Sequence, residues 1–229
     1  MKKDLLKRII TSIILLSLLI IINFSNQLIF ISSILILGLL INFEVNNIFS
    51  RLSKTQFQKK KLHTKIINFK FLVLHFISFY YVFFIFCNFS YEIHRFEGPI
   101  FYLYLISICF FTDIGGYVFG KIIGGPKLTK ISPNKTISGT IGSFIFCIVP
   151  FILFLNLGYL DLEVNLNDIV FFLLVSLVSQ LGDLFISYLK RKAKIKDTGK
   201  ILPGHGGILD RVDGIIFAVP FSYFLLKLI

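Results

Sequence analysis

Apolar runs of membrane-helix length recur along the chain and alternate with short polar segments. About 20 mainly apolar residues in a helix cross the hydrocarbon core of a bilayer. Segments that reach or approach this length are 9–24, 27–43, 70–89, 100–120, 137–157, 168–189 and 212–228. The first and the last are short. The pattern predicts an all-α, polytopic integral membrane helix bundle of about seven transmembrane helices.

The cationic residues fall in alternate polar segments. Of the 24 Lys and Arg residues, all but Arg95 and Lys227 lie before the first apolar run or in Arg51–Lys70, Lys121–Lys135 and Lys190–Arg211. Because cytoplasmic loops carry the excess of Lys and Arg, the N-terminus and these loops are expected on the cytoplasmic side. The basic start of the chain followed by residues 9–24 imitates a signal peptide. It lacks a small-x-small cleavage site, so a retained first helix is expected.

The composition supports a membrane protein and argues against a nucleic-acid partner. Hydrophobic residues make up 55% of the 229-residue chain and charged residues 16%, against about 25% charged in soluble domains. The net charge of +12 lies in the loops, so it reports membrane topology. The basic stretch Arg51–Lys70 is expected to be a solvated loop that attracts anionic lipid. We divide the chain into residues 1–99, N-terminal transmembrane helices with this basic cytoplasmic loop, and residues 100–229, the expected catalytic domain.

Two acids, Asp113 and Asp183, interrupt apolar runs well away from their ends. An intramembrane carboxylate is costly and therefore indicates function. Each lies seven residues before the predicted cytoplasmic end of its run, about 10 Å deep at 1.5 Å per residue. Matching depths favour one shared cavity. Two separate interhelical hydrogen bonds are the alternative.

The helix that carries Asp183 continues with a polar face. Asp183, Ser187, Lys190 and Lys194 follow the spacing i, i+4, i+7, i+11, which aligns residues along one side of a helix. Such a face suits a metal ion followed by phosphate. A collar of snorkelling lysines would explain the lysines but not the acid beneath them.

A glycine-rich turn and a pair of acids follow the basic run. The turn Pro203–Gly207 carries few side chains, so its backbone N–H groups can approach an anion. Asp210 and Asp213, spaced i, i+3, provide oxygen ligands of the kind that Mg²⁺ takes beside substrate phosphates. The alternatives are a plain turn and, for one of the acids, a helix cap.

The loop before residue 137 provides further candidates. Gly115, Gly116 and Gly120 thin the helix near Asp113 and permit close packing or ligand approach. Lys135 and Thr136 stand near glycines in this loop and suggest phosphate contacts. A simple connection between two helices remains open.

The C-terminal half resembles the phosphatidate cytidylyltransferase (CDP-diacylglycerol synthase) family. The resemblance rests on Ser187-x-x-Lys190-Arg191-x4-Lys196-Asp197-x-Gly199-x3-Pro203-Gly204-His205-Gly206-Gly207-Ile208-x-Asp210-Arg211-x-Asp213, and on a second block from Thr112-Asp113 to Lys135-Thr136-x-x-Gly139. The chain departs from the family pattern at Ser138, where the family usually has Glu, and at Gly116, where it often has Ala.

The resemblance implies a reaction and its participants. CTP and phosphatidic acid would give CDP-diacylglycerol and pyrophosphate, with Mg²⁺ as cofactor and a second cation left open. It also implies a homodimer in the bacterial inner membrane, with its active site facing the cytoplasm. Asp183, Asp210 and Asp213 are the expected metal ligands, with Lys190 and Arg191 beside them in the catalytic group. The expected substrate-binding residues are Ser187, Lys196, Asp197, His205, Gly206, Gly207, Arg211, Asp113, Lys135 and Thr136.

Other classes of membrane protein compete with this reading. A polyprenol- or dolichol-type lipid kinase would use ATP and release no pyrophosphate. A CDP-alcohol phosphotransferase needs a DGxxAR-type motif, which Asp213-Gly214-Ile215-Ile216 does not continue. An ion or metabolite carrier could use Asp113 and Asp183, but carriers more often show repeated halves.

Overall fold

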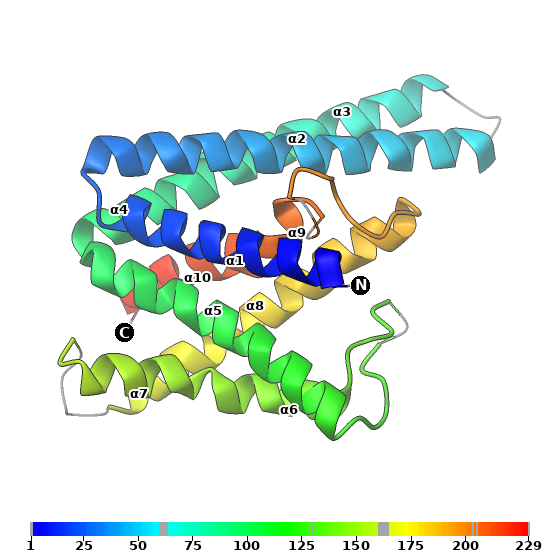
Figure 1. Cartoon of the computed structure of the whole chain (residues 1–229). Helices are drawn as coiled ribbons and strands as arrows, with labels where there is room; N and C mark the ends of the chain where they lie inside the picture. Colours follow the sequence, from blue (N-terminus) through cyan, green and yellow to red (C-terminus); the bar gives the residue numbers. More distant parts are fainter. Residues whose placement is uncertain are drawn as a thin grey trace. The chain divides into compact units, whose positions relative to one another are not determined.

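The computed structural model describes residues 2–59, 64–129, 131–159, 165–202, 204 and 206–228. These residues form helices, loops and two isolated β-bridges, with no strand among them, which confirms the predicted all-α class. The elements, labelled in Figure 1 except for η1, are α1 (Lys2–Asn23), α2 (Gln27–Lys59), α3 (Thr64–Tyr80), the π-helix η1 (Tyr81–Cys87), α4 (Asn88–Phe96), α5 (Gly98–Ile122), α6 (Ile137–Phe146), α7 (Ile148–Asn156), α8 (Leu166–Lys192), α9 (Leu209–Val212) and α10 (Ile215–Leu228).

Five helical segments within the described residues are long and apolar enough to cross a membrane. They are Gln27–Lys54, Phe69–Phe96, Gly98–Ile122, Ile137–Asn156 and Leu166–Lys192. At 1.5 Å per residue they are about 30–42 Å long, which covers a hydrocarbon core of about 30 Å. The protein is therefore a multi-pass membrane protein. Ile9–Asn23 is a shorter apolar helix and α10 has 14 residues, so the count of seven spans and the side of the N-terminus stay predictions.

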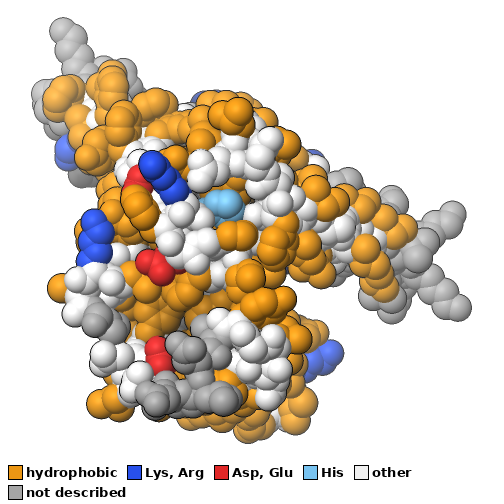
Figure 2. Space-filling model, turned by 90° about the vertical axis from the view of Figure 1, so that its left-hand side faces the viewer, with side chains coloured by type: hydrophobic (Ala, Val, Ile, Leu, Met, Phe, Trp, Pro, Cys, Tyr) orange, Lys and Arg blue, Asp and Glu red, His pale blue; other side chains and the backbone are white. Residues whose placement is uncertain are grey.

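Large apolar side chains cover much of the surface. In the face shown in Figure 2, hydrophobic side chains predominate and charged ones are few. Ile13, Leu28, Phe69 and Ile122 are each more than 60% exposed, and they lie on four different helices. A surface of this kind is unfavourable in water and suits contact with lipid chains.

The chain divides into two compact units. One comprises residues 1–91 and 189–212, and the other residues 92–188 and 213–229. The segment 189–212, which carries most of the glycine-rich motif, therefore clusters with the N-terminal helices. The functional division after residue 99 stays a prediction.

In the first unit, α2 packs along α3 and η1 (Figure 1). Gly38 permits this approach, because a Cβ atom there would come 2.7 Å from Cys87 Sγ. The prediction of a loop over Arg51–Lys70 is wrong for most of its length, since α2 runs on to Lys59 and α3 begins at Thr64. Lysine, arginine and glutamine have good helix propensity, and α2 continues through them.

In the second unit, α5 packs closely against α6. A Cβ atom at Gly139 would come 2.7 Å from the Gly116 carbonyl oxygen, and one at Gly116 would come 2.7 Å from Ser143 Oγ. The glycines thus allow close helix packing, one of the two roles predicted for them. The predicted helix 137–157 is divided into α6 and α7 at Cys147, because Pro150 has no N–H to bond the carbonyl of the preceding turn.

Candidate functional site

The end of α8 differs from the predicted polar face. The helix ends at Lys192, and Lys194 adopts a left-handed conformation (φ 56°). The Ile195 N–H donates to the Lys190 carbonyl at 3.0 Å, and the Lys194 N–H to the Arg191 carbonyl at 3.1 Å. These bonds form a C-terminal helix cap that turns the chain. Lys194 therefore does not continue the helical face predicted for Asp183, Ser187 and Lys190.

Asp210, on the short helix α9, accepts bonds from several parts of the same unit. Lys190 Nζ donates to its Oδ1 at 2.8 Å, and the two side chains are only 11% and 7% exposed. Its Oδ2 accepts from Thr198 N at 2.8 Å and from Gly207 N at 2.9 Å. Asp210 thus ties the end of α8 to both sides of the glycine-rich turn.

The environment of Asp210 favours its ionised form. Burial alone would raise the pKa of this carboxyl. The hydrogen bonds from Lys190 and Gly207 and the lysine charge outweigh burial and lower the pKa below its ordinary value. Asp210 therefore remains an anion at neutral pH.

The glycine turn donates an N–H group to a carboxylate of the protein itself, that of Asp210. Gly206 has φ +86°, a conformation that L side chains rarely adopt, and the next N–H, that of Gly207, points to Asp210. The Leu202 N–H closes the turn on the Gly206 carbonyl at 2.9 Å. Pro203 and His205 lie outside the described residues. A substrate contact of Gly206 or Gly207 stays a prediction.

Glu44, on α2, is a site residue that the sequence pattern did not indicate. Its carboxylate is 1% exposed and accepts three hydrogen bonds: from Thr198 Oγ1 at 2.6 Å, Leu209 N at 2.9 Å and Ile208 N at 3.0 Å. Glu44 directly follows the predicted span 27–43, so it looked like a residue of the helix end. The available signal was a single acid between Phe43 and Val45 on a helix that stays apolar beyond it at Ile48 and Phe49.

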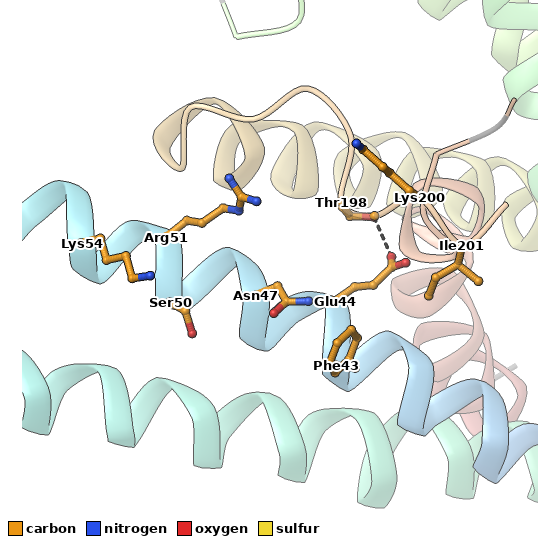
Figure 3. A pocket seen from close by; sticks show the side chains of 10 residues that line it. Phe43, Glu44, Asn47, Ser50, Arg51, Lys54, Thr198, Lys200 and Ile201 are labelled. Carbon is orange, nitrogen blue, oxygen red and sulfur yellow. Dashed lines mark hydrogen bonds between the residues drawn. The ribbon is translucent and has the colours of Figure 1, made fainter. Parts of the chain in front are cut away.

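A cationic pocket lies beside this carboxylate. It has a volume of 590 Å³ and is shown in Figure 3. Its lining includes the exposed side chains of Arg51 and Lys54 from α2 and of Lys200 from the loop that follows α8, together with Glu44 and Thr198. The other lining residues are Phe43, Asn47, Ser50, Gly199 and Ile201. The pocket could accommodate an anionic group.

The second unit contains another acid–lysine pair. Lys135 Nζ lies 2.5 Å from Asp183 Oδ2, and the two side chains are 28% and 23% exposed. Ser187 Oγ donates to Asp183 Oδ1 at 3.2 Å, as the helical spacing predicted. Two predicted site residues from different sequence blocks, Lys135 and Asp183, are thus in contact.

The loop before α6 is held by hydroxyl groups from its own end and from the first turn of α6. Thr136 caps α6 by accepting a bond from Gly139 N at 3.1 Å. Ser138 Oγ lies 2.9 Å from Thr136 Oγ1 and donates to the Gly124 carbonyl. Where the family usually has Glu, this chain therefore has a side chain that fastens a glycine turn.

The remaining predicted site residues are placed individually. Asp213 is buried, and its Oδ1 accepts from Gly214 N at 3.1 Å. Arg191 Nη1 contacts the Ile195 carbonyl at 3.5 Å, in an exposed position. The other exposed members of the predicted set are Asp113, Lys196, Asp197 and Arg211.

The carboxylates suit a hard cation by chemical type. Magnesium takes oxygen ligands, which the carboxylates of Asp183 and Asp210 both offer. Among the residues described, no three His, Cys, Asp or Glu side chains gather closely enough to hold a metal ion. The set Asp183, Asp210 and Asp213 around one Mg²⁺ stays a prediction.

Fold and site together define a multi-pass membrane protein with acid–lysine pairs beside glycine-rich polar loops. A sequence model of the cytidylyltransferase family matches residues 48–229, and the chain belongs to this family.

Individual relatives bear the name that the sequence motifs indicated. The chain is 47% identical over 136 residues to a phosphatidate cytidylyltransferase of Staphylococcus aureus (strain COL), an alignment that covers 58% of this chain and 51% of that protein. It is 42% identical over 132 residues to the phosphatidate cytidylyltransferase of Bacillus subtilis (strain 168), covering 57% and 49%. The chain spans about half the length of the curated relatives it matches. The resemblance found in the sequence is confirmed.

Proposed function

We propose that the protein is a phosphatidate cytidylyltransferase. A phosphate oxygen of phosphatidic acid attacks the α-phosphorus of CTP, and the bond from that phosphorus to the oxygen bridging to the β-phosphorus breaks. Pyrophosphate leaves with the bonding electron pair, and CDP-diacylglycerol is the product. The observation that carries the proposal is the Lys190–Asp210 pair, locked into the glycine-rich turn of the motif shared with the family.

Charge is the main obstacle to this reaction. Two polyanions must meet, so neutralisation and positioning are the principal tasks of the site. The attacking phosphate is already an anion and needs no strong general base. The acyl chains of phosphatidic acid can stay in the bilayer, which suits a site carried by helices with lipid-compatible surfaces.

Some of these residues stabilise the structure of the site, and others are proposed to contact the substrates. Lys190 is neutralised by Asp210, so its main task is to fix the end of α8. Arg191, Lys196 and Arg211 are exposed and can bind phosphate groups. Lys135 can move from Asp183 to a substrate phosphate, because both side chains are about one quarter exposed.

Magnesium is the cofactor that these carboxylates fit by type, and Asp183, Asp210 and Asp213 would hold it. When bound, it would supply charge neutralisation for the triphosphate, and a second cation is left open. We further propose a homodimer in the bacterial inner membrane, with the active site facing the cytoplasm. The excess of Lys and Arg in alternate loops supports that orientation.

Turnover by the purified protein tests the proposal. Phosphatidic acid is incubated in detergent with CTP or ATP, with Mg²⁺ or EDTA, and both the lipid product and pyrophosphate are measured. CDP-diacylglycerol and pyrophosphate in equal amounts, with CTP and Mg²⁺ only, are expected. Lipid phosphorylation from ATP without pyrophosphate would instead identify a kinase. If neither nucleotide is consumed, the proposed enzymatic activity is rejected.

A further inference from the structure

We propose that Glu44 is a positioning residue for nucleotidyl transfer, because it holds the loop Thr198–Asp210 in its working shape. This inference rests on the proposed function for its catalytic consequence. It assigns a role in the site to α2, a helix that the motifs do not reach. The matched family range begins at residue 48, so Glu44 also lies outside that range.

The contacts of Glu44 show a side chain built into the loop. Figure 3 shows its carboxylate turned from α2 toward Thr198. The three donors come from both ends of the loop: the Thr198 hydroxyl at its start and the Ile208 and Leu209 amides at its end. A buried carboxylate is unfavourable unless it is hydrogen-bonded, and a buried amide is costly without an acceptor. Glu44 and the loop therefore satisfy each other's polar groups.

Glu44 also explains two glycines of the motif. A Cβ atom at Gly199 would come 2.5 Å from Glu44 Oε1. A Cβ atom at Gly207 would overlap both the Glu44 carboxylate and the Thr198 hydroxyl. At these two positions the absence of a side chain makes room for Glu44.

A short path connects Glu44 to the proposed catalytic group. Thr198 gives its hydroxyl to Glu44 and its backbone N–H to Asp210, at 2.6 Å and 2.8 Å. Leu209, whose amide Glu44 accepts, directly precedes Asp210. Loss of Glu44 should therefore disturb the position of Asp210 and, with it, the Lys190 ammonium. Glu44 acts through these residues and need not touch substrate.

The experiment compares Glu44→Ala and Glu44→Gln with Asn42→Ala. Asn42 is a matched control, because it is buried on the same helix and its side chain accepts a bond from Asn46 of that helix at 2.7 Å. Hydrogen exchange of the amides in 198–210 reports the loop without any assay of activity. Steady-state kinetics with CTP and phosphatidic acid then separate kcat from KM.

The expected loss is larger in the variant that leaves the loop amides fewer hydrogen-bond acceptors. In Glu44→Ala, amides 198–210 exchange about tenfold faster or more, and kcat falls by a similar factor with KM for phosphatidic acid nearly unchanged. Glu44→Gln keeps one acceptor for the loop amides and should restore part of both losses. Asn42→Ala should leave exchange in 198–210 unchanged. If Glu44→Ala does not fold, Thr198→Val and Thr198→Ser test the same contact, since only serine keeps the hydroxyl that donates to Glu44 and that also lies 3.1 Å from Asp210 Oδ2.

Specific outcomes would overturn the inference. One is a folded Glu44→Ala protein in which kcat and the hydrogen exchange of the amides in 198–210 match those of Asn42→Ala. Another is Glu44→Gln being as damaging as Glu44→Ala with KM and kcat changing together, which indicates general destabilisation. A wild-type protein that does not consume CTP would reject the proposed function instead. Hydrogen exchange of the amides in 198–210 would then decide by itself whether Glu44 holds the loop.

Discussion

Two acid–lysine pairs, one in each unit, have different surroundings. Lys190–Asp210 is nearly buried, and Asp210 also accepts two backbone N–H groups. Lys135–Asp183 leaves about one quarter of each side chain exposed, and Asp183 also accepts a bond from the Ser187 hydroxyl. The same two residue types thus form a fixed junction in one unit and an accessible pair in the other.

The difference in exposure indicates that the two pairs have different roles. Removing one partner of a buried pair strongly destabilises the protein, because the remaining buried charge has no partner. A partly exposed pair contributes little to stability where its exposed side faces water, since water can then replace the lost partner. Lys190–Asp210 should therefore affect both folding and activity, whereas Lys135–Asp183 should affect activity with little change in stability.

Asp210→Asn should give the largest effect. It leaves the Lys190 ammonium buried without its counter-ion, so the free energy of unfolding should fall by about 3–5 kcal/mol and turnover should be lost. Thermal unfolding in detergent and CDP-diacylglycerol formation measure the two effects. The double variant Lys190→Met/Asp210→Asn removes the orphan charge and should recover part of the stability without activity. Wild-type stability of the single variant would show that the pair is not a fixed junction.

Asp183→Asn should separate activity from stability. Turnover is expected to fall by roughly 100-fold or more, as for the loss of one group that stabilises charge in a transition state. The free energy of unfolding should change by less than about 1 kcal/mol, because the pair is partly exposed. The same two measurements apply. A stability loss as large as that of Asp210→Asn would remove the distinction between the pairs.

The main features of the fold could be predicted from the sequence, because apolar runs of membrane length directly constrain helices. The break at Cys147 and the π-helix Tyr81–Cys87 could not. Both are local departures from helical geometry inside continuous apolar runs, where periodicity gives no boundary. The helix over residues 51–59 was missed because a dense run of charge was interpreted as a loop, although its residues favour helix.

The candidate site could be predicted in its members but not in its pairings. Spacing identifies residues on one helical face, as for Asp183 and Ser187. It cannot show that Lys190 meets Asp210, or that Lys135 meets Asp183, because those contacts depend on how distant segments pack. Glu44 was missed for the same reason. Its partners begin 154 residues further along the chain.

Lys135→Met tests the accessible pair from its cationic side. Turnover should fall about tenfold, because a mobile positive charge near the proposed phosphate site is lost, while stability should change by less than about 1 kcal/mol. Lys121→Met is the matched control. Lys121 is exposed at the end of α5 and contacts the ring and hydroxyl of Tyr117. Equal losses of turnover in the two variants would mean that Lys135 acts only through general surface charge.

Ser138→Ala should give the smallest effect of the series. It removes the hydroxyl that donates to the Gly124 carbonyl, so the turn before α6 loses about one hydrogen bond, worth roughly 1 kcal/mol. Lys135 lies in the loop, three residues before Ser138. A turn that is held less firmly should position Lys135 less well, so turnover should fall only a few-fold. Ser138→Thr keeps the hydroxyl and should stay near the wild type in turnover and thermal unfolding. If Ser138→Ala were as damaging as Asp183→Asn, Ser138 would have a direct role at the accessible pair, and the difference between the two pairs would no longer rest on Lys135 and Asp183 alone.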